Sequence, residues 1–362
     1  MLKNAFVIAW RNLLRNKRFT LLNLLGLTVG ITAFIMISLY IIQELSYDRF
    51  YADSDRIYRI TTQWAGAENT HQYATTPPPL GPIVQNEIPE AEAVTRLFKF
   101  SDFTLRPETN FDKVFRDSEV YAADSTLANV LDYEWIQGDP QTAFIEPYSF
   151  VLPKSVAIKY FGEKAFTRNE IVGKHLLIGK DGGTPAKVTG IIEDQPQTSH
   201  FQFDMLVSMS TYGNMPDLNN WSWAIMHTYI KLNEEGNMDK VEERLATIVK
   251  KHAIPYIQSD PHAFTTGEEV LRFNLQPLTD IHLHSDMLRE MQTNGNVLYI
   301  YLFLGISFFI ILIASVNFMN LSTAQAGKRA KEVGVRKMFG AHRSGLILQF
   351  LTEAMLFSFL AG

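Results

Sequence analysis

The sequence predicts a membrane protein in which α-helical transmembrane segments flank a mixed α/β extracytoplasmic domain. Two long stretches among the 362 residues, 19–43 and 291–327, contain no Asp, Glu, Lys or Arg. Charge is divided along the chain, because residues 1–18 and 328–343 each carry +5 and residues 44–296 carry −14. Strand-like and helix-like segments alternate between the two charge-free stretches, which is typical of a sheet covered by helices.

The N-terminal residues 1–18 predict a cytoplasmic amphipathic helix. Trp10 lies on its apolar face, and Arg11, Arg15 and Arg18 lie on the opposite, basic face. Such a helix is expected in the membrane interface. A simple topology anchor is the alternative, and the apolar stripe favours a docked helix.

The first charge-free stretch, residues 19–43, predicts transmembrane helix 1. At about 1.5 Å per residue it spans roughly 36 Å, enough for a hydrocarbon core of about 30 Å. A cleaved signal peptide is the alternative, but the run is long and YIIQELSYDRF offers no A-x-A pattern. Gly26 and Gly30 form a G-x-x-x-G pattern that permits close helix packing or has no role.

Residues 44–296 are expected to form one extracytoplasmic domain. DRIYRITTQW alternates like a strand, TPPPLGPIVQNEIPEA begins a helix, and AVTRLFKF returns to strand character. KHLLIGKDGGTPAKVTGIIED predicts a hairpin around Gly179, HTYIKLN predicts a strand, and MDKVEERLATIVKKHA predicts an amphipathic helix. The charge of −14 gives no reason to expect nucleic acid as a partner.

The second transmembrane helix is expected at residues 297–320, followed by a cytoplasmic segment at 321–344 and the start of a third helix at 345–362. The positive-inside rule places the N-terminus and residues 328–343 in the cytoplasm. Asn317 and Asn320 end the second span and can bond across helices or simply lie at the interface. The stretch KRAKEVGVRKMFGAHRSGL mixes Glu332 with cations on a helix, which favours docking onto a partner protein over lipid anchoring alone.

No motif predicts a cofactor, a catalytic centre or a metal site. GKHLLIGKD fails the phosphate-loop spacing, and the absence of cysteine excludes disulfides, thiolate metal sites and cysteine nucleophiles. DIHLHSD places His282 and His284 on one face of a possible strand, where they can form part of a metal site. A third ligand is not apparent, so we expect edge or turn residues there.

The chain resembles the FtsX-like/MacB-like permeases of ABC transporters. AWRNLLRNKRFTLLNLLGLTVG, VTGIIEDQPQTSHFQFD and above all NFMNLSTAQAGKRAKEVGVRKMFGAHRSGLILQFLTEA carry the resemblance, and LANVLDYEWIQGDPQTAF and SFVLPKSVAIKYFG are similar to the MacB-type periplasmic core domain. The resemblance implies a non-enzymatic permease that relays movement of a separate cytoplasmic ATPase to the periplasm, working in export or envelope extraction.

The resemblance also implies partners and contact residues. The partners are a cytoplasmic ABC ATPase, a second permease copy forming a dimer, membrane lipids, and a periplasmic adaptor or membrane-fusion protein. The ATPase contact carried onto this chain comprises Lys331, Glu332, Gly334, Arg336, Lys337 and Gly340. An inserted smaller part is expected near residues 205–270. The family has four spans per unit, so a chain ending within its third is expected to be a truncated permease.

Two alternatives from other classes remain at this point. A membrane-anchored sensory receptor also places a ligand domain between two spans, but it predicts a long coiled coil after the second span. An apolar segment resumes at Gly345 instead. A membrane-anchored metalloenzyme would use His282 and His284.

Overall fold

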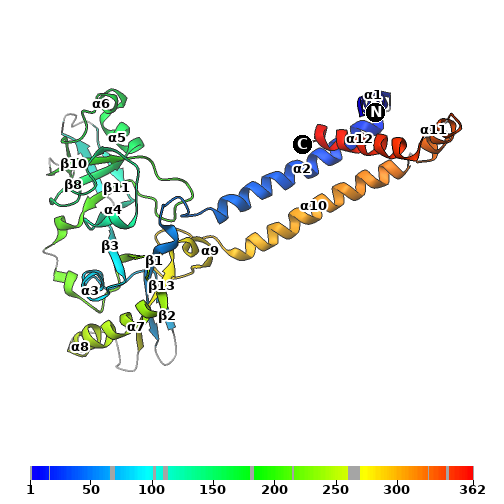
Figure 1. Ribbon diagram of the computed structural model, residues 1–362. Coiled ribbons are helices and arrows are strands. Elements are labelled where there is room, and N and C mark those ends of the chain that lie inside the picture. Colours follow the sequence, from blue (N-terminus) through cyan, green and yellow to red (C-terminus); the bar gives the residue numbers. More distant parts are fainter. Residues whose placement is uncertain are drawn as a thin grey trace. The chain divides into compact units, whose positions relative to one another are not determined.

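The protein divides into two compact units. The computed structural model describes all residues except 1, 16, 66–69, 101–102, 109–112, 180–182, 214–215, 260–269, 325, 340–341 and 362. The helical unit comprises Met1–Leu45 and Asn296–Gly362, and the sheet unit comprises Ser46–Gly295. Figure 1 shows the long helices of the first and the strands and short helices of the second.

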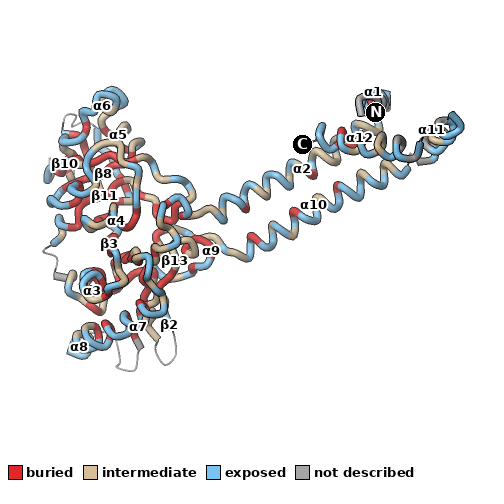
Figure 2. Tube along the Cα trace, viewed as in Figure 1, coloured by how far each residue is buried: buried red, intermediate tan, exposed pale blue. Residues whose placement is uncertain are grey.

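Within the described residues, the helical unit contains two helices that are long and apolar enough to cross a membrane. They are α2 (Lys17–Leu45) and α10 (Val297–Ala324), which contain the spans expected at 19–43 and 297–320. Most of their side chains are exposed or half-buried, as Figure 2 shows by the scarcity of red along both helices. An apolar surface of this kind is stable against lipid, so the unit is membrane-spanning.

The two long helices pack closely where α2 carries its glycines. A Cβ placed on Gly30 would lie 2.6 Å from the Cβ of Ala314 on α10, and one on Gly26 would lie 3.0 Å from the Nδ2 of Asn317. Toward the other end, the rings of Tyr40 and Phe303 meet edge to face at 5.3 Å. The glycine pattern therefore serves a helix contact, one of the two roles considered for it.

The described residues of the helical unit form three further helices: α1 (Leu2–Arg15), α11 (Ala326–Met338) and α12 (Arg343–Ala361). The amphipathic α1 docks through Leu13, which is buried with Leu356 and Phe357 of α12. The helix expected over residues 1–18 ends at Arg15, and Arg18 belongs to α2.

The sheet unit is built on one mixed sheet. Among the described residues its strands follow the order β13-β1-β12-β3-β6-β11-β8-β10-β9-β4-β5, with β2 paired to β1 and β7 paired to β10. The strands are β1 (Ile57–Ala65), β2 (Thr70–Tyr73), β3 (Ala91–Lys99), β4 (Phe103–Pro107), β5 (Phe115–Asp117), β6 (Val120–Ala123), β7 (Trp135–Gly138), β8 (Ser149–Pro153), β9 (His175–Ile178), β10 (Thr184–Ile192), β11 (Met205–Ser208), β12 (His227–Leu232) and β13 (Val270–Pro277). The pairs β6–β11 and β8–β10 are parallel, and the other pairs are antiparallel.

Short helices cover the sheet and occupy its connections. They are α3 (Leu80–Glu87), α4 (Leu127–Val130), α5 (Lys154–Phe161), α6 (Glu163–Thr167), α7 (Met238–Ile248), α8 (Ile254–Ser259) and α9 (Ile281–His284), with a π-helical turn at Val249–Ala253 and 3-10 turns at Ser54–Arg56, Met209–Tyr212, Pro216–Asn219 and Leu278–Asp280. Buried side chains of α3 and α7 pack together on β1, β12 and β13, and those of α5 pack on β8 and β10.

One half of the sheet has a split β-α-β topology. β1-α3-β3 and β12-α7-β13 each contribute two strands, and these four strands stand in the order β13-β1-β12-β3. The strands β4–β11, between β3 and β12 in the chain, form the other half. The inserted smaller part that was expected near residues 205–270 does not correspond to either half of the sheet. Within that range, β12 and α7 belong to the split β-α-β half, whereas β11 lies between β6 and β8 in the other half. Sequence patterns locate strands but not their partners.

Local expectations for the sheet unit agree with the structure. β1, α3, β3, β12 and α7 lie where the strand–helix–strand pattern, the HTYIKLN strand and the amphipathic helix were expected. The predicted hairpin pairs β9 antiparallel with β10, from His175↔Lys187 to Ile178↔Thr184. A long helix after β12 is interrupted by the π-helical turn, which the sequence did not predict.

Candidate functional site: the connectors between the sheet and the membrane helices

Two short segments join the sheet to the membrane helices in the chain. We call residues 46–56, between α2 and β1, the entry connector, and residues 278–295, between β13 and α10, the exit connector. Because β1 and β13 pair antiparallel, with Tyr58 opposite Pro277, both connectors leave the same end of the sheet. Any movement passing between the helices and the sheet along the chain must pass through these two segments.

The two connectors contact each other through stacked rings. Tyr47 of the entry connector and His282 of the exit connector lie with ring centroids 3.3 Å apart and planes only 2° from parallel. The contact joins a half-buried tyrosine of one connector to a buried histidine of the other. His282 is buried, and this contact accounts for its position.

This arrangement corrects the expectation for His282 and His284. They lie on the short helix α9 rather than on a strand, so their side chains diverge by about 200° around the helix axis. His282 is buried and His284 is exposed. Within the part of the chain that the structure describes, no three His, Asp or Glu side chains gather as a metal site would require. The described residues therefore hold no cluster of the kind that the metalloenzyme alternative would use.

The entry connector is anchored in the sheet unit by Asp48. This residue adopts φ +58°, a left-handed conformation that Asp tolerates better than most residues. Its N–H donates to the carbonyl of Thr198 at 2.8 Å, and its carboxylate accepts from the N–H of His200 at 3.1 Å. The Nδ1 of His200 also lies 2.9 Å from Asp48 Oδ1. Asp48 and His200 are both buried, so the turn after α2 is fixed by a desolvated pair.

The contacts of Asp48 and His200 continue to the exit connector through Tyr229 of β12. His200 Nε2 lies 2.7 Å from the Tyr229 hydroxyl, and that hydroxyl donates to Met291 Sδ at 3.6 Å. Burial raises the pKa of Tyr229 well above its ordinary value, so the phenol keeps its proton. Tyr229 therefore connects the residues that hold Asp48 with the segment leading into α10.

Arg59 of β1 anchors the exit connector. Its guanidinium is fully buried and forms a two-pronged pair with Glu290, through Nη1 at 2.6 Å and Nη2 at 3.0 Å. Nη2 also donates to Gln276 Oε1 at 2.7 Å and Ser285 Oγ at 2.9 Å. Burial alone would raise the pKa of Glu290, but the hydrogen bonds and charge of Arg59 outweigh it and hold that pKa below its ordinary value.

The exit connector contains a second backbone constraint. Arg289 adopts φ +62°, its guanidinium donates to the carbonyl of Ala224, and it lies 5.4 Å from the ring centroid of Tyr73. Each connector therefore contains one left-handed, non-glycine residue held by side-chain contacts. Such residues persist only where the surrounding structure over-determines them.

The buried side chain of His227, which is close to Arg59 and His200, predicts that the folded protein loses stability in acid. Burial, with the charges of Arg59 and His200 nearby, lowers the pKa of His227 from 6.5 to about 3. As pH falls below 6.5 the unfolded chain binds this proton and the folded chain does not, so stability falls through the window from 6.5 to 3. Between pH 7.5 and 5.0 the free energy of unfolding should drop by about 2 kcal/mol. Urea titration at the two pH values, followed by tryptophan fluorescence, measures this.

The matched variants separate His227 from other groups. His227→Gln should remove most of the drop, because glutamine binds no proton in either state. His284→Gln, the same substitution at an exposed position, should leave the drop in place. An equal pH dependence in the chain with His227→Gln would contradict the assignment.

The residues expected to contact an ATPase lie on α11 or just beyond it. Lys331, Glu332, Gly334, Arg336 and Lys337 are within the helix Ala326–Met338. Gly334 and Lys337 are exposed. The side chains of Lys331, Glu332 and Arg336, and the whole of Gly340, lie outside the described residues, so their role stays a prediction.

The residues expected at the membrane interface are exposed. Arg11, Arg15 and Arg18 are exposed, and Trp10 keeps 44% of its surface accessible. Phe6, Trp10 and Leu14 repeat every four residues on α1 and are all exposed, while Leu13 is buried against α12. The helix thus docks through one part of its apolar face and offers the other to its surroundings.

Of the connector residues, sequence reasoning singled out His282 and His284, and it did so for a metal site rather than for a contact between segments. The available signal was Arg59, a charged residue at an inward position of an alternating strand between Ile57 and Thr61, both buried. A buried arginine requires a carboxylate partner, yet nothing in the sequence selects Glu290 from the other acids.

The fold and the connectors define a class: a membrane protein in which two spans frame a sheet unit that contacts both connectors. Two family models match this chain, the MacB-like periplasmic core domain over residues 20–248 and the FtsX-like permease C-terminal domain over residues 304–362. The chain belongs to the FtsX/MacB-like family of ABC transporter permeases. A sensory receptor would have a long coiled coil after the second span. Residues 304–362 of this chain match the FtsX-like permease C-terminal domain instead.

Relatives and solved structures give more distant likenesses. The macrolide export ATP-binding/permease protein MacB of Escherichia coli O6:K15:H31 (strain 536 / UPEC) and that of Escherichia coli K12 are each 22% identical over 372 residues. The alignment covers 99% of this chain and 51% of each relative, so the chain spans about half their length. A domain of a permease protein from Porphyromonas gingivalis superposes with TM-score 0.53 and 22% identity, covering 63% of this chain and 91% of that one. This last likeness supports the fold alone.

Proposed function

We propose that this chain is the permease subunit of an ABC transporter that relays movement of a separate cytoplasmic ATPase to a periplasmic sheet unit, for export or for extraction from the envelope. The observation that carries the proposal is the connector pair. Two membrane helices lead into segments that are joined to each other by Tyr47 and His282 and to the sheet by Asp48 and Arg59. ATP hydrolysis then belongs to the partner, and the chain itself needs no cofactor.

The charge distribution supports the orientation. The two +5 segments, residues 1–18 and 328–343, are cytoplasmic in this proposal, and residues 44–296, with −14, lie in the periplasm. The protein is then a multi-pass protein of the bacterial inner membrane with a cytoplasmic N-terminus. Trp10, Arg11, Arg15 and Arg18 contact lipids at the inner interface.

Stiff connectors suit a relay of movement. A flexible linker lets one part move without the other, whereas a segment held by a buried ion pair, buried hydrogen bonds and stacked rings does not. Residues 46–56 contain no glycine, and residues 278–295 contain only Gly295 at the end. A change in the tilt or separation of α2 and α10 is therefore passed to the adjacent strands β1 and β13.

The ATPase contact is proposed at α11 and the turn after it. Lys331, Glu332, Gly334, Arg336, Lys337 and Gly340 combine both signs of charge on a short element, which favours specific docking to a protein surface. A second permease copy and a periplasmic adaptor or membrane-fusion protein complete the proposed assembly, and nucleic acid has no part in it.

Co-purification of the cognate ATPase subunit with the full chain tests the proposal. Reversing one charge in the contact, by Glu332→Lys or Arg336→Glu, should abolish the co-purification, because like charges brought together across an interface cost several kcal/mol. The same reversals at exposed positions of α6 and the residue after it, Glu163→Lys and Arg168→Glu, serve as matched controls and should leave it unchanged. Retention of the ATPase by both contact variants would rule out this coupling segment.

A further inference from the structure

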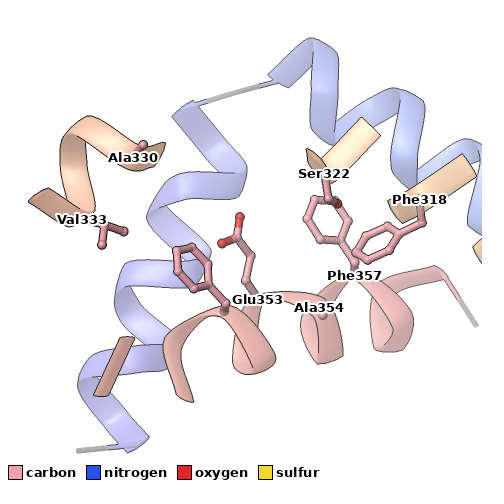
Figure 3. A pocket seen from close by; sticks show the side chains of 8 residues that line it. Phe318, Ser322, Ala330, Val333, Glu353, Ala354 and Phe357 are labelled. Carbon is pink, nitrogen blue, oxygen red and sulfur yellow. The ribbon is translucent and has the colours of Figure 1, made fainter. Parts of the chain in front are cut away.

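Each unit of the protein contains a hollow that the proposed relay does not use. In the helical unit it lies between α10, α11 and α12, and Figure 3 shows Glu353 rising from α12 into this space. Glu353 already has an interaction within the protein, and we infer no ligand there. In the sheet unit the hollow measures about 480 Å³ and lies between β13 and the helical segment that runs from α7 to α8. This second hollow borders the edge of the sheet.

The strand β13 offers unpaired main-chain groups to this hollow. Among the described residues it pairs with β1 on one side, and no strand pairs with its other side. The N–H of Leu275 donates to Glu242 Oε1 at 2.9 Å, so this N–H points away from β1. Because the direction of these groups alternates along an antiparallel strand, the N–H and C=O groups of Leu271 and Phe273 also point away from β1. Both residues line the hollow.

The opposite wall of the hollow is helical. It is formed by residues of α7, the π-helical turn and α8, namely Glu242, Ala246, Val249, Lys250 and Ile254. Since Glu242 reaches the outward N–H of Leu275, α7 extends along the outer edge of β13. A π-helical turn within a helix is rare and is frequently found at functional sites. The hollow is therefore a groove between a helical segment and a strand edge.

The chemistry of this groove fits an extended polypeptide. The N–H and C=O groups of a strand edge are matched by those of another strand, whereas an apolar molecule leaves them unpaired. The side chains of Leu271 and Phe273 lie in the apolar cluster beneath α7, and Ile254 adds an exposed apolar side chain. The residues of an added strand that face the helices are therefore expected to be apolar.

A second copy of this chain fits the groove less well than a single strand does. Antiparallel pairing of two β13 strands about a two-fold axis places both α7 helices on the same face of the joined sheet. Each α7 extends along the outer edge of its own β13, so the two helices would meet over the joint. A single extended segment enters the groove without bringing a second helix.

We propose that an extended segment of a partner protein adds to the sheet as a strand beside β13 and antiparallel to it, with apolar side chains at alternate positions facing α7 and α8. In this arrangement Leu271 and Phe273 each exchange two hydrogen bonds with the residue opposite. Glu242 occupies the N–H of Leu275 and ends the pairing there. The proposal concerns the sheet unit alone and stands whether or not the chain relays movement from an ATPase.

Fluorescence anisotropy of a labelled peptide with the purified full chain in detergent tests the proposal. The probe is a short peptide of alternating valine and threonine. In the antiparallel pair the valine opposite Phe273 faces the helices and directs its N–H toward β13, whereas the threonines direct theirs away. N-methylation of the valine amides should weaken binding about tenfold, and N-methylation of the threonine amides should change it by less than about twofold. Absence of binding by the unmodified peptide, or equal binding of the two N-methylated peptides, would overturn the proposal.

Variants locate the site. Ala246→Trp fills the groove from an exposed position of α7 and should abolish most of the binding. Thr247→Trp, the same change at the neighbouring exposed residue outside the lining, should preserve it. Retained binding by a folded chain with Ala246→Trp would contradict a site in this groove. Replacing residues 260–269 with a glycine-serine linker of equal length should leave binding unchanged, and binding seen only in that variant would assign the edge to this chain's own segment instead of a partner.

Discussion

Replacing Arg59 with methionine is expected to lower the free energy of unfolding by about 3–5 kcal/mol, because one partner of a buried ion pair is lost. The guanidinium has no exposed surface and holds Glu290, Gln276 and Ser285. Without it, the largely buried carboxylate of Glu290 keeps its desolvation cost and loses its cation. The exit connector would at the same time lose its attachment to β1.

Urea unfolding of the full chain, followed by tryptophan fluorescence, measures the effect, since four of the five tryptophans (Trp64, Trp135, Trp221 and Trp223) lie in the sheet unit. Lys154→Met is the matched control. It breaks the pair of Lys154 with Glu193, whose side chains are 38% and 39% exposed, so its cost should stay below about 1 kcal/mol. A loss for Arg59→Met as small as that of the control would show that the buried pair is not an anchor.

The double variant Arg59→Met with Glu290→Met separates two effects of losing Arg59. One is the loss of the exit connector's attachment to β1, and the other is the cost of leaving the buried carboxylate of Glu290 unpaired. Two apolar side chains in place of a buried pair often restore stability. We expect the double variant to be more stable than Arg59→Met alone. If the relay proposal is correct, it should still fail in transport, because the connector is no longer fixed to the sheet by directional bonds.

Substituting leucine for Gly30 is expected to separate α2 from α10. Even a Cβ at this position would lie 2.6 Å from Ala314 Cβ, closer than carbon atoms approach without displacement. Both helices are long and well formed, so they would move apart or shift rather than bend locally. The contact between Tyr40 and Phe303 reports the change, because these rings lie at 5.3 Å on the same helix pair.

Cross-linking measures the separation cleanly because the chain has no cysteine. A chain with Tyr40→Cys and Phe303→Cys should react efficiently with a short bismaleimide, and adding Gly30→Leu should reduce the cross-linked yield severalfold. Gly305→Leu is the control on α10, since a Cβ at Gly305 meets nothing within 4 Å. An unchanged yield with Gly30→Leu would show that the pair does not depend on the glycine.

The sequence predicts the membrane helices well because their signal is one of composition over many residues. A charge-free run of 25 residues has few stable structures other than a spanning helix, and α2 contains the whole run. Local patterns also predict β1, α3, β3, the β9–β10 hairpin and α7, since each depends on neighbours in the chain. Pairing between distant strands, such as β6 with β11, leaves no local pattern.

The candidate site was less predictable, because it depends on contacts between residues far apart in the chain. His282 attracted attention for a metal site, yet its ring stacks on Tyr47, which no local spacing indicates. Asp48 looks like an ordinary acid after a span until its left-handed backbone and its contact with His200 are seen. The family resemblance, in contrast, came from residues 317–354 as well as the N-terminal and core stretches, and both family models bear it out.

The position of β1 sets the order in which the protein can mature. β1 begins at Ile57, whereas its neighbours β12 and β13 begin at His227 and Val270. The backbone edges of β1 therefore lack these two partners while most of the sheet unit is synthesised. Meanwhile β2 covers only Thr62–Ala65 on one side. An unpaired strand edge invites association between nascent chains, so this region is most prone to association before the last strand has been made. The closing strand is also the one followed by the exit connector, so completion of the sheet and attachment of the second membrane helix are a single late event.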